Sequence, residues 1–174
     1  EISTRDWSSD VCSSDLSTRW VREYPNLMLS RTLSKVYGLA GLRVGFGLAQ
    51  AELTDLMNRI RQPFNTNSIA QAAAIAAIAD DEFVERSYRL NRDGLAKLQS
   101  GFAALGLEYV PSHGNFVLVR VGNAGAVYEG LLRQGVIVRP VGGYGLPEWL
   151  RVSVGLPAEN DRLLAALSQV LGRK

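Results

Sequence analysis

The chain has 174 residues, of which 47% are hydrophobic and 21% are charged, and its formal net charge is +2. This length suits one domain or parts of two. No apolar run approaches the roughly 20 residues that a membrane-spanning helix needs, and the small, evenly spread charge argues against a nucleic-acid surface. The single cysteine excludes an internal disulfide, and the single histidine argues against a metal site. No signal-peptide pattern is present at the N-terminus, so we expect a cytoplasmic location.

The first sixteen residues differ from the rest of the chain. They show neither helical nor strand periodicity, and residues 6–16, DWSSDVCSSDL, match the translation of a common short-read sequencing adapter. We therefore predict that residues 1–16 are a disordered assembly artefact and that native sequence begins near Ser17. Because no start methionine precedes Ser17, we expect the native part to begin inside a longer protein.

The segment 17–80 is predicted to form part of one domain. Its apolar patterns predict two strands and two helices, over residues 27–33, 42–49, 52–62 and 69–79. The first strand is typical of a buried strand. The helix over 69–79 is alanine-rich on all sides, so we expect it to be buried on all sides. Asn67 or Ser68 can cap that helix at its N-terminus.

A long helix over residues 81–106 is predicted to connect this domain to a second one. Its length would be on the order of 36 Å, at 1.5 Å per residue. Beyond it, residues 107–174 are predicted to form a smaller α/β domain. Its pattern gives four strands and two helices, over residues 107–110, 115–121, 124–134, 136–139, 150–154 and 159–171. The fold class is therefore α/β.

The segment 30–45, SRTLSKVYGLAGLRVG, contains the residues best suited to chemistry. A lysine directly after a buried strand has apolar walls near its amine, which favour the uncharged form that attacks a carbonyl group. The hydroxyls of Thr32 and Ser34 and the guanidinium of Arg43 would hold an anionic group near Lys35. The structural alternative is an exposed lysine at a strand end, followed by a glycine turn.

The order Thr32-Leu-Ser-Lys35, followed by Gly38, Gly41 and Arg43, resembles the cofactor-lysine motif of class II aminotransferases. The whole span 17–173 is similar to the histidinol-phosphate aminotransferases, through RQPFNTNSIAQAA, GNFVLVRVG, GVIVRPV, YGLP and LRVSVGLP. Val36 and Gly143 depart from the family pattern, which usually has a small residue and an asparagine at these positions. The resemblance implies the C-terminal part of the large domain, which binds pyridoxal phosphate (PLP), and the small C-terminal domain of a fold-type-I aminotransferase.

The resemblance also implies roles for individual residues. Lys35 would carry PLP and move a proton between the substrate carbon and the cofactor, and Ser34, Thr32 and Arg43 would bind the cofactor. The resemblance assigns Arg151 to a substrate carboxylate and Arg139 to the substrate phosphate.

Each substrate assignment has a structural alternative. Arg151 can pair with an acidic residue at a strand end, and Arg139 can be a surface residue before a proline turn. The side-chain amide of Asn115 either contacts the substrate or forms the hydrogen bonds that a turn needs.

The activity implied is amino transfer between glutamate and imidazole-acetol phosphate, which gives histidinol phosphate in histidine biosynthesis, by a homodimer. The alternatives are an aromatic amino acid aminotransferase, a relative of threonine-phosphate decarboxylase, or a non-catalytic fragment that binds a partner. In the resembling family, the residues that hold the cofactor ring lie upstream of the lysine. We therefore expect this chain alone to have little or no transaminase activity.

Overall fold

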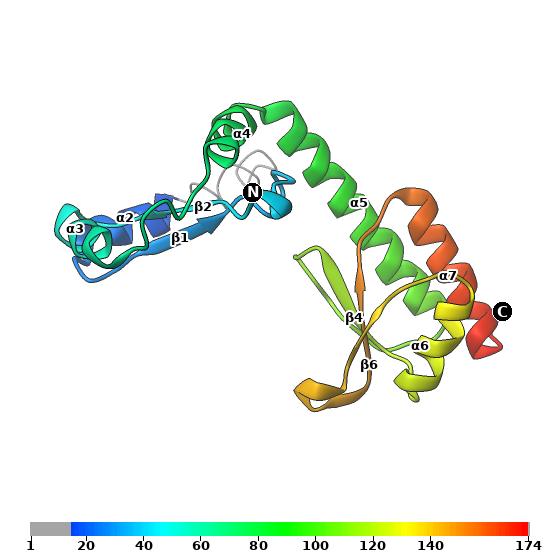
Figure 1. Cartoon of the computed structure of the whole chain (residues 1–174). Coiled ribbons are helices and arrows are strands. Elements are labelled where there is room, and N and C mark those ends of the chain that lie inside the picture. The colour runs from blue at the N-terminus through cyan, green and yellow to red at the C-terminus, as the bar shows by residue number, and fades with distance from the viewer. Residues whose placement is uncertain (1–14, 174) are drawn as a thin grey trace. The chain divides into compact units, whose positions relative to one another are not determined.

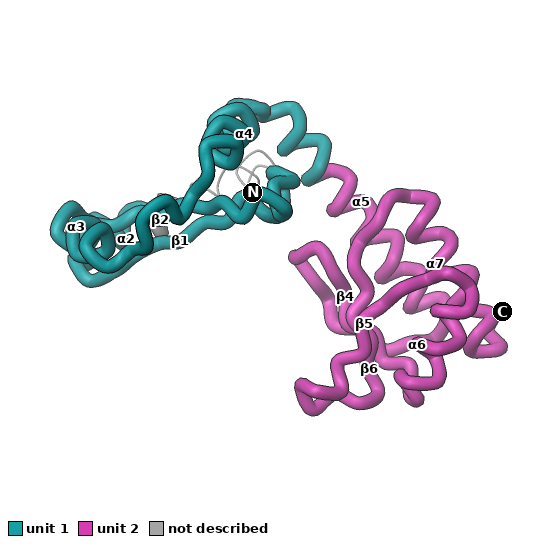
Figure 2. The backbone as a smooth tube through the Cα atoms, in the orientation of Figure 1, with its two compact units in different colours: residues 1–88 teal, residues 89–174 magenta. Residues whose placement is uncertain are grey.

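The structure, a computed structural model, describes residues 15–173, with side chains from residue 18 onward. Residues 1–14 lie outside the described residues. Asp15 and Leu16 belong to helix α2 (Asp15–Glu23), so the expected disorder is wrong for these two residues, and the foreign origin of residues 1–16 stays a prediction. The chain divides into two compact units, Glu1–Tyr88 and Arg89–Lys174 (Figure 2). The division falls inside the long helix that was predicted to connect two domains. No helix among the described residues is long and apolar enough to cross a membrane.

Unit 1 contains a two-stranded antiparallel sheet and a set of helices (Figure 1). Its elements are α2 (Asp15–Glu23), β1 (Leu29–Thr32), a 3-10 turn (Ala40–Leu42), β2 (Gly45–Leu48), α3 (Ala51–Ile60), α4 (Ser68–Ile78) and the first part of α5 (Asp81–Ala104). The two strands pair from Leu29 opposite Leu48 to Thr32 opposite Gly45. Gly45 is required there, because an added Cβ atom would lie 2.5 Å from the Arg31 carbonyl oxygen.

Burial in unit 1 differs from the prediction. Strand β1 alternates between half-buried and exposed residues rather than being buried throughout. Helix α4 begins as predicted, since the Asn67 Oδ1 accepts the Ala70 N–H at 2.8 Å. The expected burial of α4 on all sides is wrong, because Ile69 and Ile75 are 71% and 75% exposed. Apolar composition shows which side chains gain from burial, but not whether the described chain supplies a surface to cover them.

Unit 2 contains a four-stranded antiparallel sheet in the order β3-β4-β6-β5. Its elements after α5 are β3 (Tyr109–Val110), β4 (Phe116–Arg120), α6 (Ala124–Arg133), β5 (Arg139–Val141), a 3-10 turn (Gly142–Tyr144), β6 (Leu146–Ser153) and α7 (Pro157–Leu171). Strands β5 and β6 form a hairpin around the 3-10 turn, with a bulge at Pro140/Val141. This is the mixed α/β content that the sequence predicts.

The core of unit 2 lies between one face of this sheet and the helices α5, α6 and α7 (Figure 1). Leu98 and Phe102 of α5, Leu131 of α6 and Leu167 of α7 are each no more than 1% exposed and belong to one apolar cluster with the sheet. Along β6 the side chains alternate between the two faces of the sheet, and Leu150 and Val152 enter the core. The residue between them, Arg151, therefore lies on the opposite face.

Candidate functional site

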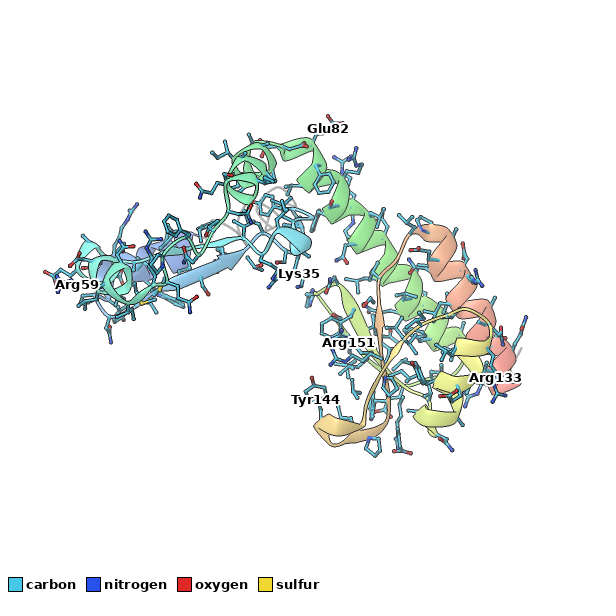
Figure 3. The ribbon with its side chains drawn as sticks, in the orientation of Figure 1. Lys35, Arg59, Glu82, Arg133, Tyr144 and Arg151 are labelled. Atoms are coloured by element: carbon cyan, nitrogen blue, oxygen red, sulfur yellow. The ribbon has the colours of Figure 1, made fainter. Side chains whose placement is uncertain are left out.

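The predicted cofactor residues lie at the end of β1 and in the loop between β1 and β2. Leu33, only 1% exposed, anchors the start of this loop, and its N–H donates to the Val44 carbonyl at 3.1 Å. The Leu39 N–H donates to the Leu33 carbonyl at 3.0 Å, and the Gly38 N–H donates to the Lys35 carbonyl at 2.9 Å. These bonds close a turn, with Gly38 at a φ of +70°, that carries Lys35 (Figure 3).

The surroundings of Lys35 differ from the prediction. The lysine follows a strand as expected, but its side chain is exposed in this structure. The apolar walls predicted around the amine are not formed by the described residues, because β1 itself is not buried. The exposed position leaves the amine accessible to a ligand that enters the loop.

The polar groups beside Lys35 are arranged by short-range hydrogen bonds. The Thr32 hydroxyl accepts the Ser34 N–H at 3.1 Å, which folds the chain before the lysine. Arg43 has a φ of 53°, a left-handed conformation that costs a non-glycine residue about 1–2 kcal/mol. Its Nη1 donates to the Ala40 carbonyl at 2.8 Å. The structure therefore places Ser34, Lys35 and Arg43 in the loop that follows Thr32, the last residue of β1. Strained backbone of the kind seen at Arg43 is concentrated at functional sites.

The two predicted substrate arginines are brought together in unit 2. Arg139 of β5 lies directly opposite Arg151 of β6 in the antiparallel register, so both side chains project from the same face of the sheet. Arg139 is exposed and Arg151 is half-buried. Like charges directly opposite each other destabilise a strand pair. An anion bound between the two guanidinium groups would remove this repulsion.

Arg151 is held by an aromatic ring rather than by a carboxylate. Its Cζ lies 5.1 Å from the centroid of the Phe116 ring, and its buried Nε has no hydrogen-bond partner among the described residues. Sequence analysis missed Phe116, although it lies in the Gly-Asn-Phe motif. The contact depends on the register between β4 and β6, which periodicity does not give.

Asn115 lies next to this pair, at the start of β4. Its backbone carbonyl accepts the Val154 N–H at 2.9 Å, which extends the pairing of β4 and β6. The Asn115 side chain is exposed. The preceding turn is tied to α5, since the Asn91 Nδ2 donates to the Gly114 carbonyl at 3.0 Å. A substrate role for Asn115 stays a prediction.

A third arginine on this sheet has a different environment. Arg120 of β4 donates to Glu148 at 2.8 Å and to Glu108 at 3.1 Å. The hydrogen bonds that Arg120 donates, first to Glu148 and then to Glu108, raise the pKa of its guanidinium. Its donors are therefore engaged by the chain itself, which favours a structural role for Arg120.

A loop with an accessible lysine, Lys35, and a pair of arginines, Arg139 and Arg151, are features expected of an aminotransferase. The chain belongs to the family Aminotransferase class I and II, whose model matches residues 9–167. Within it, the chain is 66% identical over 161 residues to histidinol-phosphate aminotransferase 2 of Ralstonia nicotianae, covering 90% of this chain and 43% of that protein. It is 65% identical over 159 residues to histidinol-phosphate aminotransferase 1 of Cupriavidus pinatubonensis, covering 89% and 42%. The chain thus spans less than half the length of these relatives.

Solved structures agree with the fold. The histidinol-phosphate aminotransferase of Sinorhizobium meliloti, solved in complex with pyridoxal-5'-phosphate, is 35% identical with a TM-score of 0.78, covering 85% of this chain and 42% of that one. The histidinol-phosphate aminotransferase of Clostridium acetobutylicum is 25% identical with a TM-score of 0.84, covering 96% and 52%. The predicted α/β class and the fold-type-I aminotransferase architecture are confirmed.

Proposed function

We propose that this chain supplies the cofactor lysine and the substrate arginines of an enzyme that transfers an amino group between glutamate and imidazole-acetol phosphate, using PLP. The names and identities of the relatives support this substrate pair. The proposal includes the three-part organisation of 17–80, 81–106 and 107–174, a homodimeric enzyme and a cytoplasmic location. Because the chain spans less than half of its relatives' length, we assign the full reaction to the whole protein.

The donor set of the β1–β2 loop suits PLP. When bound, this cofactor supplies an aldehyde that a lysine amine can attack and a ring that accepts electrons from the substrate carbon. The accessible Lys35 amine suits the aldehyde. The Arg43 guanidinium and the Ser34 hydroxyl suit the phosphate, because a planar guanidinium donates two parallel hydrogen bonds to phosphate oxygens. Lys35 would also take up and return the proton at the substrate carbon.

The observation that carries the substrate class is the register of Arg139 opposite Arg151. Two like charges at one position of a sheet favour a ligand with strong negative charge, such as a carboxylate or a phosphate. We assign Arg151 to the substrate carboxylate and Arg139 to the substrate phosphate. This assignment separates the proposed enzyme from aminotransferases of unphosphorylated aromatic substrates.

Reductive trapping tests the cofactor lysine. The full chain is incubated with PLP, reduced with borohydride and digested, and the modified peptides are quantified by mass spectrometry. Lys35, Lys97 and Lys174 are the only lysines of the chain. We expect the label to be concentrated on Lys35, because Arg43 and Ser34 hold the phosphate next to its amine.

Two variants complete this test. Lys35→Ala should remove most of the label. Lys97→Ala is the matched control and should leave the labelling of Lys35 unchanged, since Lys97 is paired with Asp161 on unit 2. Equal labelling of the three lysines, or labelling of Lys35 that survives Arg43→Ala at full extent, would contradict the proposed cofactor loop.

A further inference from the structure

We infer that Phe116 is a positioning residue, whose ring holds the Arg151 guanidinium in the orientation that receives a carboxylate; this rests on the proposed role of Arg151. The starting observation is the distance of 5.1 Å between the Arg151 Cζ and the centroid of the Phe116 ring. A cation within about 6 Å of a ring centroid is attracted by the electron-rich face of the ring.

The register of the sheet explains how these two side chains meet. Arg151 of β6 lies directly opposite Leu118 of β4, and Phe116 lies opposite Ser153. Phe116 and Arg151 are therefore diagonal neighbours on one face, a separation that aromatic and long side chains can span. Figure 3 shows Arg151 on the side of the sheet away from α6 and α7. Phe116 is 36% exposed, so the pair borders an open surface.

The contact with the ring does not use the N–H donors of Arg151. A ring stacked on a guanidinium occupies its flat face, whereas the N–H groups point outward in its plane. No carboxylate among the described residues forms an ion pair with Arg151, and its buried Nε has no hydrogen-bond partner there. Arg120 is the contrast, because Glu148 and Glu108 already accept its N–H groups. The ring thus fixes Arg151 without consuming the groups that a planar carboxylate needs.

The expected effect of losing the ring is moderate. A partly exposed cation–π contact corresponds to roughly a threefold to tenfold change in an equilibrium constant. Replacing Phe116 with leucine removes the ring but keeps an apolar side chain. Affinity for a dicarboxylate should therefore fall by that factor, rather than vanish as expected for loss of Arg151 itself. Phe116→Tyr keeps the ring and should retain the affinity.

The test uses the full chain labelled with ¹⁵N, and it follows the Nε–Hε signal of Arg151 by NMR. In the unsubstituted chain and in Phe116→Tyr, the ring should shift this proton signal upfield. Phe116→Leu, with Phe116→Met as a second ring-free variant, should abolish that shift. Glu148→Gln is the matched control, because it changes the environment of Arg120 and should leave the Arg151 signal in place.

Each protein is then titrated with glutarate as the dicarboxylate probe. A threefold to tenfold higher dissociation constant in both ring-free variants, with restoration in Phe116→Tyr, supports the inference. An unchanged constant, or an upfield shift that survives loss of the ring, overturns it. If the natural chain shows the shift but glutarate does not perturb Arg151, then the proposed carboxylate role of Arg151 fails, and with it the positioning role, although the ring contact itself is shown.

Discussion

At the scale of single residues, Asn160 shows how a side chain substitutes for sheet hydrogen bonds. It is 2% exposed, and its amide accepts the Gly155 N–H at 2.9 Å and donates to the Gly155 carbonyl at 3.0 Å. Both backbone groups follow the end of β6, where strand pairing has stopped. The single side chain therefore satisfies two half-buried backbone groups of Gly155.

Replacing Asn160 with alanine should destabilise unit 2 clearly. Leaving two backbone groups unsatisfied costs about 2–3 kcal/mol, which corresponds to a fall in the unfolding temperature of about 10 °C for a domain of this size. Thermal unfolding followed by circular dichroism measures this effect. Gln169→Ala, at an exposed position of α7, is the control and should shift the temperature by no more than about 2 °C. Equal effects of the two variants would contradict the role of Asn160.

Arg139 allows a test of the substrate class. Removing a charge-assisted hydrogen bond to phosphate should lower affinity by about tenfold or more. Arg139→Ala should therefore weaken binding of histidinol phosphate to the full chain by this factor, and binding of histidinol much less. NMR titration of both compounds gives the comparison. If the two affinities fall equally, Arg139 does not recognise the phosphate.

Sequence reasoning assigns roles to the lysine loop and to the arginines, and these roles stay predictions, but it does not give the surroundings of these residues. The sequence predicted Thr32 and Arg43 at the ends of two strands, whereas the structure ends β1 at Thr32 and leaves Arg43 in the loop before β2, with Ser34 and Lys35. The exposure of Lys35 was one of the two alternatives that the sequence left open, because burial depends on residues distant in the sequence. The pairing of Arg139 with Arg151 depends in the same way on the strand register.

At the scale of elements, α5 and the end of β6 approach closely at Gly94. A Cβ atom added there would overlap the Val154 Cγ1 and lie 3.1 Å from the Asn160 Nδ2. Glycine in a helix interior normally costs about 1 kcal/mol relative to alanine. Its presence in α5 therefore indicates that the close packing outweighs the helix propensity.

Gly94→Ala should consequently destabilise unit 2, by about 1–3 kcal/mol, because overpacking outweighs the gain in propensity. Chemical denaturation with urea provides the measurement. Gly125→Ala is the matched control in α6, where the added Cβ would meet the Asn123 Oδ1 at an ordinary 3.7 Å. This control should be neutral or slightly stabilising. If Gly94→Ala instead stabilises unit 2, helix propensity determines the sign of the stability change at both positions.

Most helices were predicted more accurately than the strands, although α2 (Asp15–Glu23) was not predicted. The segments 52–62 and 124–134 correspond to α3 and α6 within two residues at each end, because their apolar residues repeat with the helical period. The short strand predicted over 136–139 is instead β5 at Arg139–Val141, next to a bulge at Pro140/Val141. A three-residue strand is set by its partner β6 rather than by its own sequence.

At the scale of the whole molecule, the two units differ in how much core they possess. The apolar cluster lies entirely between residues 95 and 167, in unit 2. Among the residues of unit 1 whose side chains the structure describes, from 18 to 88, the buried apolar residues are Val21, Leu33 and Ala70. Its large apolar side chains, such as Ile60 and Phe64, are 76% and 99% exposed.

Hydrogen exchange on the full chain should show this difference directly. Amides in β4, β6 and the last three helical turns of α5 should exchange slowly, because their opening requires unfolding of the core of unit 2. Amides in α3 and α4 should exchange by local opening, at least about a hundredfold faster than the amides of the unit 2 core. Mass spectrometry of peptic fragments gives the rates. Similar protection in the two units would contradict the unequal stability inferred from burial.

The unequal cores also bear on synthesis at the ribosome. Unit 1 precedes unit 2 in the chain, so its exposed isoleucines Ile69 and Ile75 leave the exit tunnel first. Adding the residues from Arg89 to Lys174 then takes about 4–17 s at roughly 5–20 residues per second. During that interval no residue of unit 2 can cover these side chains. When the 174-residue chain is produced by itself, translation speed and the availability of chaperones should therefore affect its soluble yield more than the folding rate of unit 2.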